Sequence, residues 1–213
     1  PVVVKPVNLG SSIGISKARD RQQLEEAVET AMEYADRVIV ETCVANLREI
    51  NCSALGDLDE CQSSVCEEPL NATDILTFGD KYESGSKGSS KGMESLSRKI
   101  PADLPEDVTE KIQHLAAEAF RAINGNGVAR IDFMMNNETG EVFINEINTI
   151  PGSLAFYLWQ ESGIAFDELL DKMIWLAIKR KREKDALTVT FDTNILSNNA
   201  LGGSKGGKMG SKR

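Results

Sequence analysis

Residues 127–148 constrain the fold of this chain more than any other stretch. Two strand-like runs, GVARIDFMM at 127–135 and EVFINEI at 141–147, flank the polar stretch NNETG at 136–140. Runs of this kind around a short turn that contains glycine predict an antiparallel hairpin. A five-residue turn would place Arg130 opposite Glu146 and Asp132 opposite Ile144. The chain is therefore expected to fold around an antiparallel sheet.

One face of this hairpin has a composition that suggests chemistry. Side chains alternate between the two faces of a strand, so the even-numbered positions are expected to share a face. These positions are Arg130, Asp132, Val142, Ile144, Glu146 and Asn148. Carboxylate and amide oxygens are ligands that Mg2+ prefers, so Asp132, Glu146 and Asn148 predict a metal site. The alternative is a solvated face with a cross-strand Arg130–Glu146 pair, worth less than about 1 kcal/mol. The pattern alone leaves both interpretations open.

The remaining periodic segments mix helices with strands. Apolar residues at helical spacing predict three helices. The first would begin after Asp20, a residue suited to capping, with Gln23 three residues on. The others are expected from Pro105 to about 123 and from about Phe166 to 178, followed by the basic residues at 179–182. Further strands are expected at 1–5, 37–41 and 48–55. The only histidine, His114, lies beside the apolar stripe of the second helix and is assigned no role.

Composition excludes several classes of function. The 213 residues are 41% hydrophobic, enough for a substantial core, and no apolar stretch reaches the roughly 20 residues of a membrane span. We therefore expect a soluble protein with no membrane partner. The net charge of −9 disfavours nucleic acid as a partner. Four cysteines, Cys43, Cys52, Cys61 and Cys66, lack the usual spacing of zinc ligands and are expected to be free thiols.

Two segments lack apolar periodicity. Residues 79–98 are rich in glycine and serine and are expected to form a long mobile loop, and residues 187–213 are expected to form a flexible tail that carries several basic residues. The chain begins with Pro1 inside an expected strand, so we expect it to be a piece of a longer protein.

The stretch NLGSSIG at 8–14 follows an apolar run and Lys5. Glycines allow the backbone to approach a ligand closely, and successive N–H groups with hydroxyls can surround an anion. A phosphate-binding loop is therefore predicted, with a polar hairpin turn as the alternative.

Four blocks of sequence together resemble the D-alanine:D-alanine ligase family of ATP-grasp enzymes, over residues 1 to about 182. The blocks are KPVNLGSSIGISK, VIVET with REINCSALGD, DKY ahead of IPADLPE, and RIDFMMNNETGEVFINEINTIPG. The resemblance implies an α+β ATP-grasp fold, two lobes of mainly antiparallel sheet with helices. Residues 1–44 would be the remainder of the central lobe, 45–186 the carboxy-terminal lobe with a lid loop at 79–98, and 187–213 a flexible tail.

The resemblance also implies roles for individual residues. ATP phosphates would be bound by Lys5 and the loop Gly10, Ser11 and Ser12, with Lys81 and Tyr82 reaching the phosphate and the loop serine from the lid. Glu41 would meet the adenine amino group, Cys43 and Val44 would line the base, and Glu49 would meet the ribose. The metal, Mg2+ or Mn2+, would be bound by Asp132, Glu146 and Asn148, while Arg130 would stabilise an oxyanion. The catalytic set is then Arg130, Ser11 and Tyr82, and the second substrate would meet Gly152, Ser153 and Tyr157.

The activity implied is the ATP-dependent joining of two D-alanines through an acyl phosphate, for cell-wall peptidoglycan precursors, in the cytoplasm. The complete protein would be a homodimer. Three departures leave alternatives open: the family's amino-terminal domain is missing, Leu76 replaces a usual tyrosine, and Tyr157 replaces a serine that binds the second substrate's carboxylate. The Tyr157 ring could fill that pocket and favour D-alanine, or Ser153 could supply the contact. The alternatives are a ligase with another acceptor and a nucleotide-binding fragment that is inactive without the missing domain.

Overall fold

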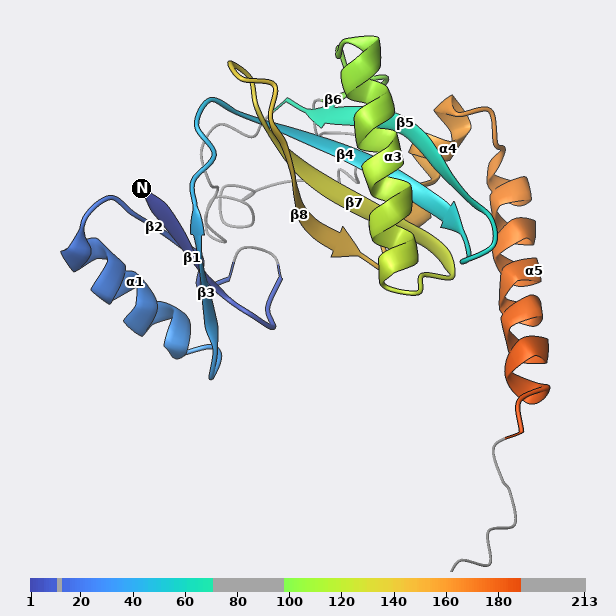
Figure 1. The fold of residues 1–213 in the computed structure, drawn as a ribbon, viewed down its shortest axis with the longest axis horizontal. Coiled ribbons are helices and arrows are strands. Elements are labelled where there is room, and N and C mark those ends of the chain that lie inside the picture. The colour runs from blue at the N-terminus through green and yellow to red at the C-terminus, as the bar shows by residue number, and fades with distance from the viewer. Residues whose placement is uncertain (11–12, 71–97, 189–213) are drawn as a thin grey trace, which may run out of the picture.

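The structure, a computed structural model, describes residues 1–10, 13–70 and 98–188 (Figure 1). Within these ranges the chain forms two antiparallel sheets, one of three strands in the order β2-β1-β3 and one of five in the order β6-β5-β4-β7-β8. Several predicted features lie outside the described residues: Ser11, Ser12, Leu76, Lys81, Tyr82, nearly all of the 79–98 loop and nearly all of the tail.

The three-stranded sheet is covered on one face by a single helix. Its strands are β1 (Val2–Pro6), β2 (Ser16–Ala18) and β3 (Val38–Thr42), and the helix is α1 (Arg21–Met32). Apolar residues of α1 pack on Val4 and Val38. The predicted start of the helix is confirmed, because the Asp20 carboxylate accepts the Gln23 N–H at 2.9 Å. Met32, the last residue of α1, is 56% exposed.

The five-stranded sheet contains the predicted hairpin. Its strands are β4 (Leu47–Gly56), β5 (Cys61–Pro69), β6 (Arg98–Lys99), β7 (Gly127–Asn136) and β8 (Val142–Asn148). Strands β4, β7 and β8 were predicted, whereas β5, β6 and the short β2 were not. The β5 sequence CQSSVCEEP has little apolar alternation. It is nevertheless held in the sheet, because it pairs with β4 on one side and β6 on the other.

Helices cover both faces of this sheet (Figure 1). On one face α3 (Glu106–Ala122) buries Ile112 and Phe120 against Ile50, Ile131 and Phe133. On the other, α4 (Phe156–Glu161) and α5 (Phe166–Asp185) bury Trp159, Leu169 and Leu176 against Leu55 and Val128. Pro105 is the residue before α3 rather than its first, and the basic residues 179–182 lie inside α5. His114 is exposed on α3.

The predicted register of the β7–β8 hairpin is wrong. Arg130 pairs with Asn148, not Glu146, and Asp132 pairs with Glu146, not Ile144. The pairing shifts after Asp132, so that Asn145 is an extra residue in β8, as in a β-bulge. The bulge also changes which side chains share a face of the sheet. Val142, predicted on the same face as Glu146, instead packs with Ile147 against the core under α3. The turn also differs from the expected five residues, because Met135 pairs with Val142 and the Asn136 N–H donates to the Glu141 carbonyl. The sequence could not indicate the extra residue, because the expected turn length alone set the predicted pairing.

All four cysteines are free thiols, as predicted. Among the described residues, no helix combines the length and the apolar character needed to span a bilayer.

Candidate functional site

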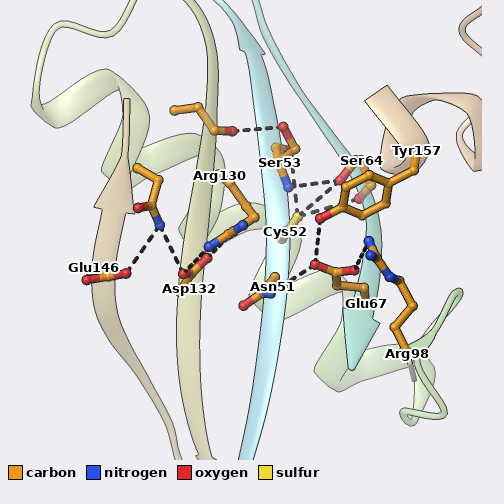
Figure 2. A network of polar contacts seen from close by, with 12 residues as sticks. Asn51, Cys52, Ser53, Ser64, Glu67, Arg98, Arg130, Asp132, Glu146 and Tyr157 are labelled. Carbon is orange, nitrogen blue, oxygen red and sulfur yellow. Dashed lines mark hydrogen bonds and ion pairs between the residues drawn. The ribbon is translucent and has the colours of Figure 1, made fainter. Parts of the chain in front are cut away.

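Four polar residues lie side by side across the five-stranded sheet, on the face away from α3. Glu67 of β5 pairs with Asn51 of β4, Asn51 with Asp132 of β7, and Asp132 with Glu146 of β8. We call these four residues the polar row (Figure 2). They share a face because they are register partners, and neighbouring positions such as Ile50 and Cys52 point into the core under α3. The polar row is the centre of the candidate site.

Arg130 forms a two-point ion pair with Asp132 of the polar row. The guanidinium Nε lies 2.6 Å from Asp132 Oδ1, and Nη2 lies 2.7 Å from Oδ2. The two residues are separated by one position on β7, so their side chains leave the same face. The hydrogen bonds to Asp132 raise the pKa of Arg130, and this outweighs the opposing effect of burial. Arg130 is therefore a fixed cation beside a carboxylate.

Asn148 joins the two carboxylates of β7 and β8. Its Nδ2 donates to Asp132 Oδ2 at 2.9 Å and to Glu146 Oε1 at 3.4 Å. The structure thus brings together the four polar residues predicted to share this face, Arg130, Asp132, Glu146 and Asn148, although by a different register. Two carboxylates and one amide now converge at one edge of the sheet.

Lys5 connects the three-stranded sheet to this edge. Its ammonium lies 2.5 Å from Glu41 Oε2 of the neighbouring strand β3. The same ammonium donates to Asn145 Oδ1, the extra residue of β8, at 3.0 Å. Residues 3, 5, 39 and 41 share the face of the small sheet away from α1, because Val3 pairs with Glu41 and Lys5 with Ile39. The Lys5 ammonium of the three-stranded sheet therefore lies against β8 at the residue that precedes Glu146.

At the other end of the polar row, Glu67 binds Tyr157 (Figure 2). The Tyr157 hydroxyl donates to Glu67 Oε1 at 2.9 Å, and Asn51 Nδ2 donates to the same oxygen at 2.9 Å. The guanidinium of Arg98 lies 4.5 Å from the centre of the Tyr157 ring. Burial, and then the charge and the hydrogen bond of Glu67, raise the pKa of Tyr157 to about 12. Tyr157 is thus a neutral donor to a buried carboxylate.

Other predicted residues lie around this centre. Glu49 precedes Asn51 by two positions on β4 and so shares its face. Cys43 and Val44 are partly buried just after β3. Gly10 is exposed, and a Cβ added there would contact nothing within 4 Å. Gly152 and Ser153, predicted to meet the second substrate, are exposed. The Ser153 hydroxyl donates to the Gly152 carbonyl.

The structure adds residues that sequence reasoning missed: Asn51, Glu67, Arg98 and Asn145. Asn51 lies on β4 and Glu67 on β5, and only the pairing of these two strands shows that their side chains meet. Asn145 reaches Lys5 because of the bulge. No sequence pattern predicts that Glu67 is buried between two strands. The adjacent glutamates Glu67 and Glu68 near the end of β5 were the only local indication of a charged site there.

Solved structures with the same fold define the class of protein. The chain matches the D-alanine-D-alanine ligase from Coxiella burnetii with a TM-score of 0.70 and 31% identity, over 86% of this chain and 47% of that one. It matches the VanG D-Ala:D-Ser ligase from Enterococcus faecalis with a TM-score of 0.66 and 30% identity, over 83% of this chain and 49% of that one. The fold is thus the α+β ATP-grasp fold, as predicted.

The sequence comparisons define the family within that class. Residues 1–175 match the family described as D-ala D-ala ligase C-terminus, and the chain belongs to this family. It is 44% identical over 185 residues to the D-alanine–D-alanine ligase of Acetivibrio thermocellus, covering 84% of this chain and 46% of the relative. The corresponding ligase of Thermosipho africanus is 37% identical over 195 residues, with 92% and 51% covered. The chain spans about half the length of these relatives.

Proposed function

We propose that this chain is the nucleotide- and metal-binding part of an ATP-dependent ligase that joins two D-alanines through an acyl phosphate. Family membership supports the reaction type. The observation that carries the proposal is the convergence of Asp132, Glu146 and Asn148 beside Arg130, with Lys5 bound to the adjacent Asn145. The product would be a peptidoglycan precursor, and because ATP is the proposed substrate we assign the activity to the cytoplasm. Assembly as a homodimer stays a prediction.

The donor set suits a hard divalent cation. Asp132 and Glu146 are register partners that supply carboxylate oxygens, and a half-turn of the Asn148 amide would present its oxygen to the same space. Asp132, Glu146 and Asn148 would therefore hold Mg2+ or Mn2+. The bound ion would neutralise charge on the phosphate oxygens of ATP.

The cations around this set have distinct tasks. Lys5, now paired with Glu41 and Asn145, would turn to phosphate oxygens when ATP binds, which leaves the Glu41 carboxylate to accept the adenine amino group. Arg130 is held by Asp132 in one orientation, so it would meet the developing oxyanion with no reorganisation. The protein supplies no nucleophile, because the substrate carboxylate itself attacks the phosphate.

The remaining assignments complete the proposed site. We place the nucleotide between the two sheets, with residues 1–44 as one lobe, 45–186 as the other and 187–213 as a tail. The ribose would meet Glu49, and the base would lie near Cys43 and Val44. The phosphates would meet Gly10, and also four residues outside the described ranges, Ser11, Ser12, Lys81 and Tyr82. The second substrate would lie near Gly152, Ser153 and Tyr157.

A titration of the complete protein with Mg2+-ATP, together with an assay of phosphate release on D-alanine, tests this function. The unaltered protein should bind Mg2+-ATP and release phosphate only with D-alanine present, forming the dipeptide. Glu146→Gln should weaken nucleotide binding and slow turnover, whereas His114→Ala, exposed on α3, should match the unaltered protein. If Glu146→Gln and the unaltered protein bind Mg2+-ATP equally, the metal assignment is wrong.

A second candidate is a ligase of the same type with a different acceptor. The match to a D-Ala:D-Ser ligase favours considering it, as does Tyr157 at the second-substrate position. The same assay decides: if D-serine, D-lactate or an L-amino acid gives much faster turnover as acceptor than D-alanine, the D-alanine assignment fails and the ligase class stands.

A further inference from the structure

The contacts of Glu67 commit the Tyr157 hydroxyl to the protein. Glu67 is only 3% exposed, and a buried carboxylate is costly unless donors surround it. Its hydrogen-bond donors are Asn51 and Tyr157, and the Arg98 guanidinium forms an ion pair with it, with Nη1 at 3.7 Å from Oε2. A phenol has one O–H, and that of Tyr157 is directed at Glu67. With its O–H bound to Glu67, Tyr157 presents its ring, and not a hydrogen-bond donor, to the space beside the polar row.

The ring itself is held from several sides. The Arg98 guanidinium lies over its face, and the ring of Phe156 lies edge-on at a centroid distance of 6.1 Å. Both arrangements are favourable contacts of an aromatic ring. The hydroxyl end is bound by Glu67 (Figure 2). A ring restrained at its face, edge and hydroxyl has little freedom to move aside for a larger ligand.

The backbone before α4 and a contact from within α4 also hold this ring beside the polar row. Three consecutive residues before α4 have positive φ, with values of 50° at Ser153, 57° at Leu154 and 51° at Ala155. Such a conformation is unfavourable for these residue types and persists where the surroundings demand it. One turn further on, Trp159 Nε1 donates to Ser53 Oγ of β4 at 3.0 Å. Trp159 thus anchors α4 to the sheet two residues beyond Tyr157.

The order of groups along the row indicates what the ring would meet. Lys5 reaches the site at Asn145 of β8, so the phosphates of the proposed function belong at that end. Arg130 on β7 comes next, where the reacting carboxyl would lie. The end at β4 and β5, bounded by Glu67 and Tyr157, is left for the amino acid that attacks.

We propose that Glu67, Arg98 and Tyr157 form a rigid wall that limits the size of the acceptor amino acid, with Glu67 as a positioning residue. This proposal rests on the ligase function proposed above. The wall admits a side chain of one carbon, as in D-alanine, and disfavours longer ones. An extra methylene pressed against an unyielding surface is rejected by roughly tenfold or more.

The test compares acceptors in the complete protein. D-Alanine and D-2-aminobutyrate, which differ by one methylene, are offered together with ATP, and the dipeptides are quantified by mass spectrometry. Tyr157→Ala should raise the ratio of kcat/KM for D-2-aminobutyrate to that for D-alanine by about tenfold. The KM for ATP should stay within about twofold, because the phosphates lie at the other end of the row. Trp175→Ala, which removes an aromatic residue that is 61% exposed on α5, should leave the ratio unchanged.

Two milder variants keep the test decisive if Tyr157→Ala does not fold, as judged by thermal unfolding. Tyr157→Phe keeps the ring and removes the bond to Glu67, and Glu67→Gln keeps an oxygen acceptor but removes the charge. Both should shift the ratio in the same direction by less, and Glu67→Gln should raise the acceptor KM more than it lowers kcat. Glu110→Gln, exposed on α3, is the matched control.

The outcomes separate this proposal from the ligase function. If the unaltered protein makes the D-alanine dipeptide but the folded variants keep its acceptor ratio, the wall is refuted and the ligase function stands. If the variants change KM for ATP as much as for the acceptor, the wall is also refuted. If the unaltered protein releases no phosphate with any small D-amino acid, the ligase function is wrong, and the wall is wrong with it.

Discussion

The two ends of one face of the five-stranded sheet differ in cover and in chemistry. At one end, Leu55 of β4 and Val128 of β7 lie under α4 and α5 in an apolar cluster. At the other, the same two strands carry Asn51 and Asp132, which belong to the polar row. The sheet is continuous, with unbroken pairing between β4 and β7 from Leu47 to Gly56. The difference therefore comes from the side chains and from where α4 begins, not from the backbone.

The contrast shows how polar groups are used at each end. In the covered end, Ser53 is fully buried, and its hydroxyl donates to the Ala129 carbonyl at 2.8 Å while it accepts from Trp159. No buried side-chain nitrogen or oxygen in the described part of the chain lacks a partner. In the open end, Asn148 donates to Asp132, and Lys5 contacts Glu41 and Asn145, at a partly exposed surface where a ligand can replace these partners. Tyr157 marks the boundary between the two.

The largest effect is expected at the open end. Asp132→Asn removes the carboxylate charge of a proposed metal ligand and the ion-pair partner of Arg130. Turnover of the complete protein should therefore fall by about 100-fold or more, with weaker binding of Mg2+-ATP. Phosphate release and calorimetric titration measure the two effects. His114→Ala serves as the control. Unchanged Mg2+-ATP binding by Asp132→Asn would contradict the proposed division of the face.

Substitutions at the covered end should lower the stability of the protein instead of its activity. Trp159 is 1% exposed, and Trp159→Ala should lower the free energy of unfolding of the complete protein by about 3–5 kcal/mol, because it empties the space under α4. Urea unfolding measures this. Trp175→Ala, at an exposed position, should cost less than about 0.5 kcal/mol. Equal losses for the two tryptophans would show that α4 does not seal this end.

A smaller loss is expected from the buried polar contact beneath α4. Ser53→Ala leaves Trp159 Nε1 without its acceptor and should lower the free energy of unfolding by about 1–3 kcal/mol. Trp159→Phe removes the other partner. The double variant should cost less than the sum of the two single changes, because neither polar group is then left alone. Strict additivity would mean that the Ser53–Trp159 bond contributes no coupling.

The smallest effect concerns pH at the boundary. The pKa of Tyr157 is raised from 10.0 to about 12, so its stabilising neutral form is fully present below pH 10. The free energy of unfolding should then fall as pH rises from 10.0 to about 12, since the unfolded state loses this proton first. Tyr157→Phe should remove this part of the pH dependence. Denaturant unfolding at several pH values measures it, and identical slopes in the two proteins would contradict the burial of the phenol.

Local sequence patterns explain much of the fold. The cap at Asp20, the periodic helices and the alternating runs of β4, β7 and β8 depend on interactions within a few residues. The predicted strands and helices are present with small shifts at their ends. Strand β5 was missed, because its residues Ser64 and Glu67 are buried by pairing and by contacts from α3 and α4, which are distant in sequence.

By itself, the sequence determined the family, the α+β ATP-grasp class and the set of oxygen-bearing residues Asp132, Glu146 and Asn148. These follow from residue types at short spacings in the sequence, and such spacings are the same whether or not the chain is folded. The tertiary structure alone decided the bulge at Asn145, the meeting of Lys5 with β8, and the burial of Glu67 against Tyr157. Each of these requires strands and helices that are far apart in the chain to pack together. The energy of such a contact depends on which residue lies opposite in the folded protein, and local sequence does not specify that residue.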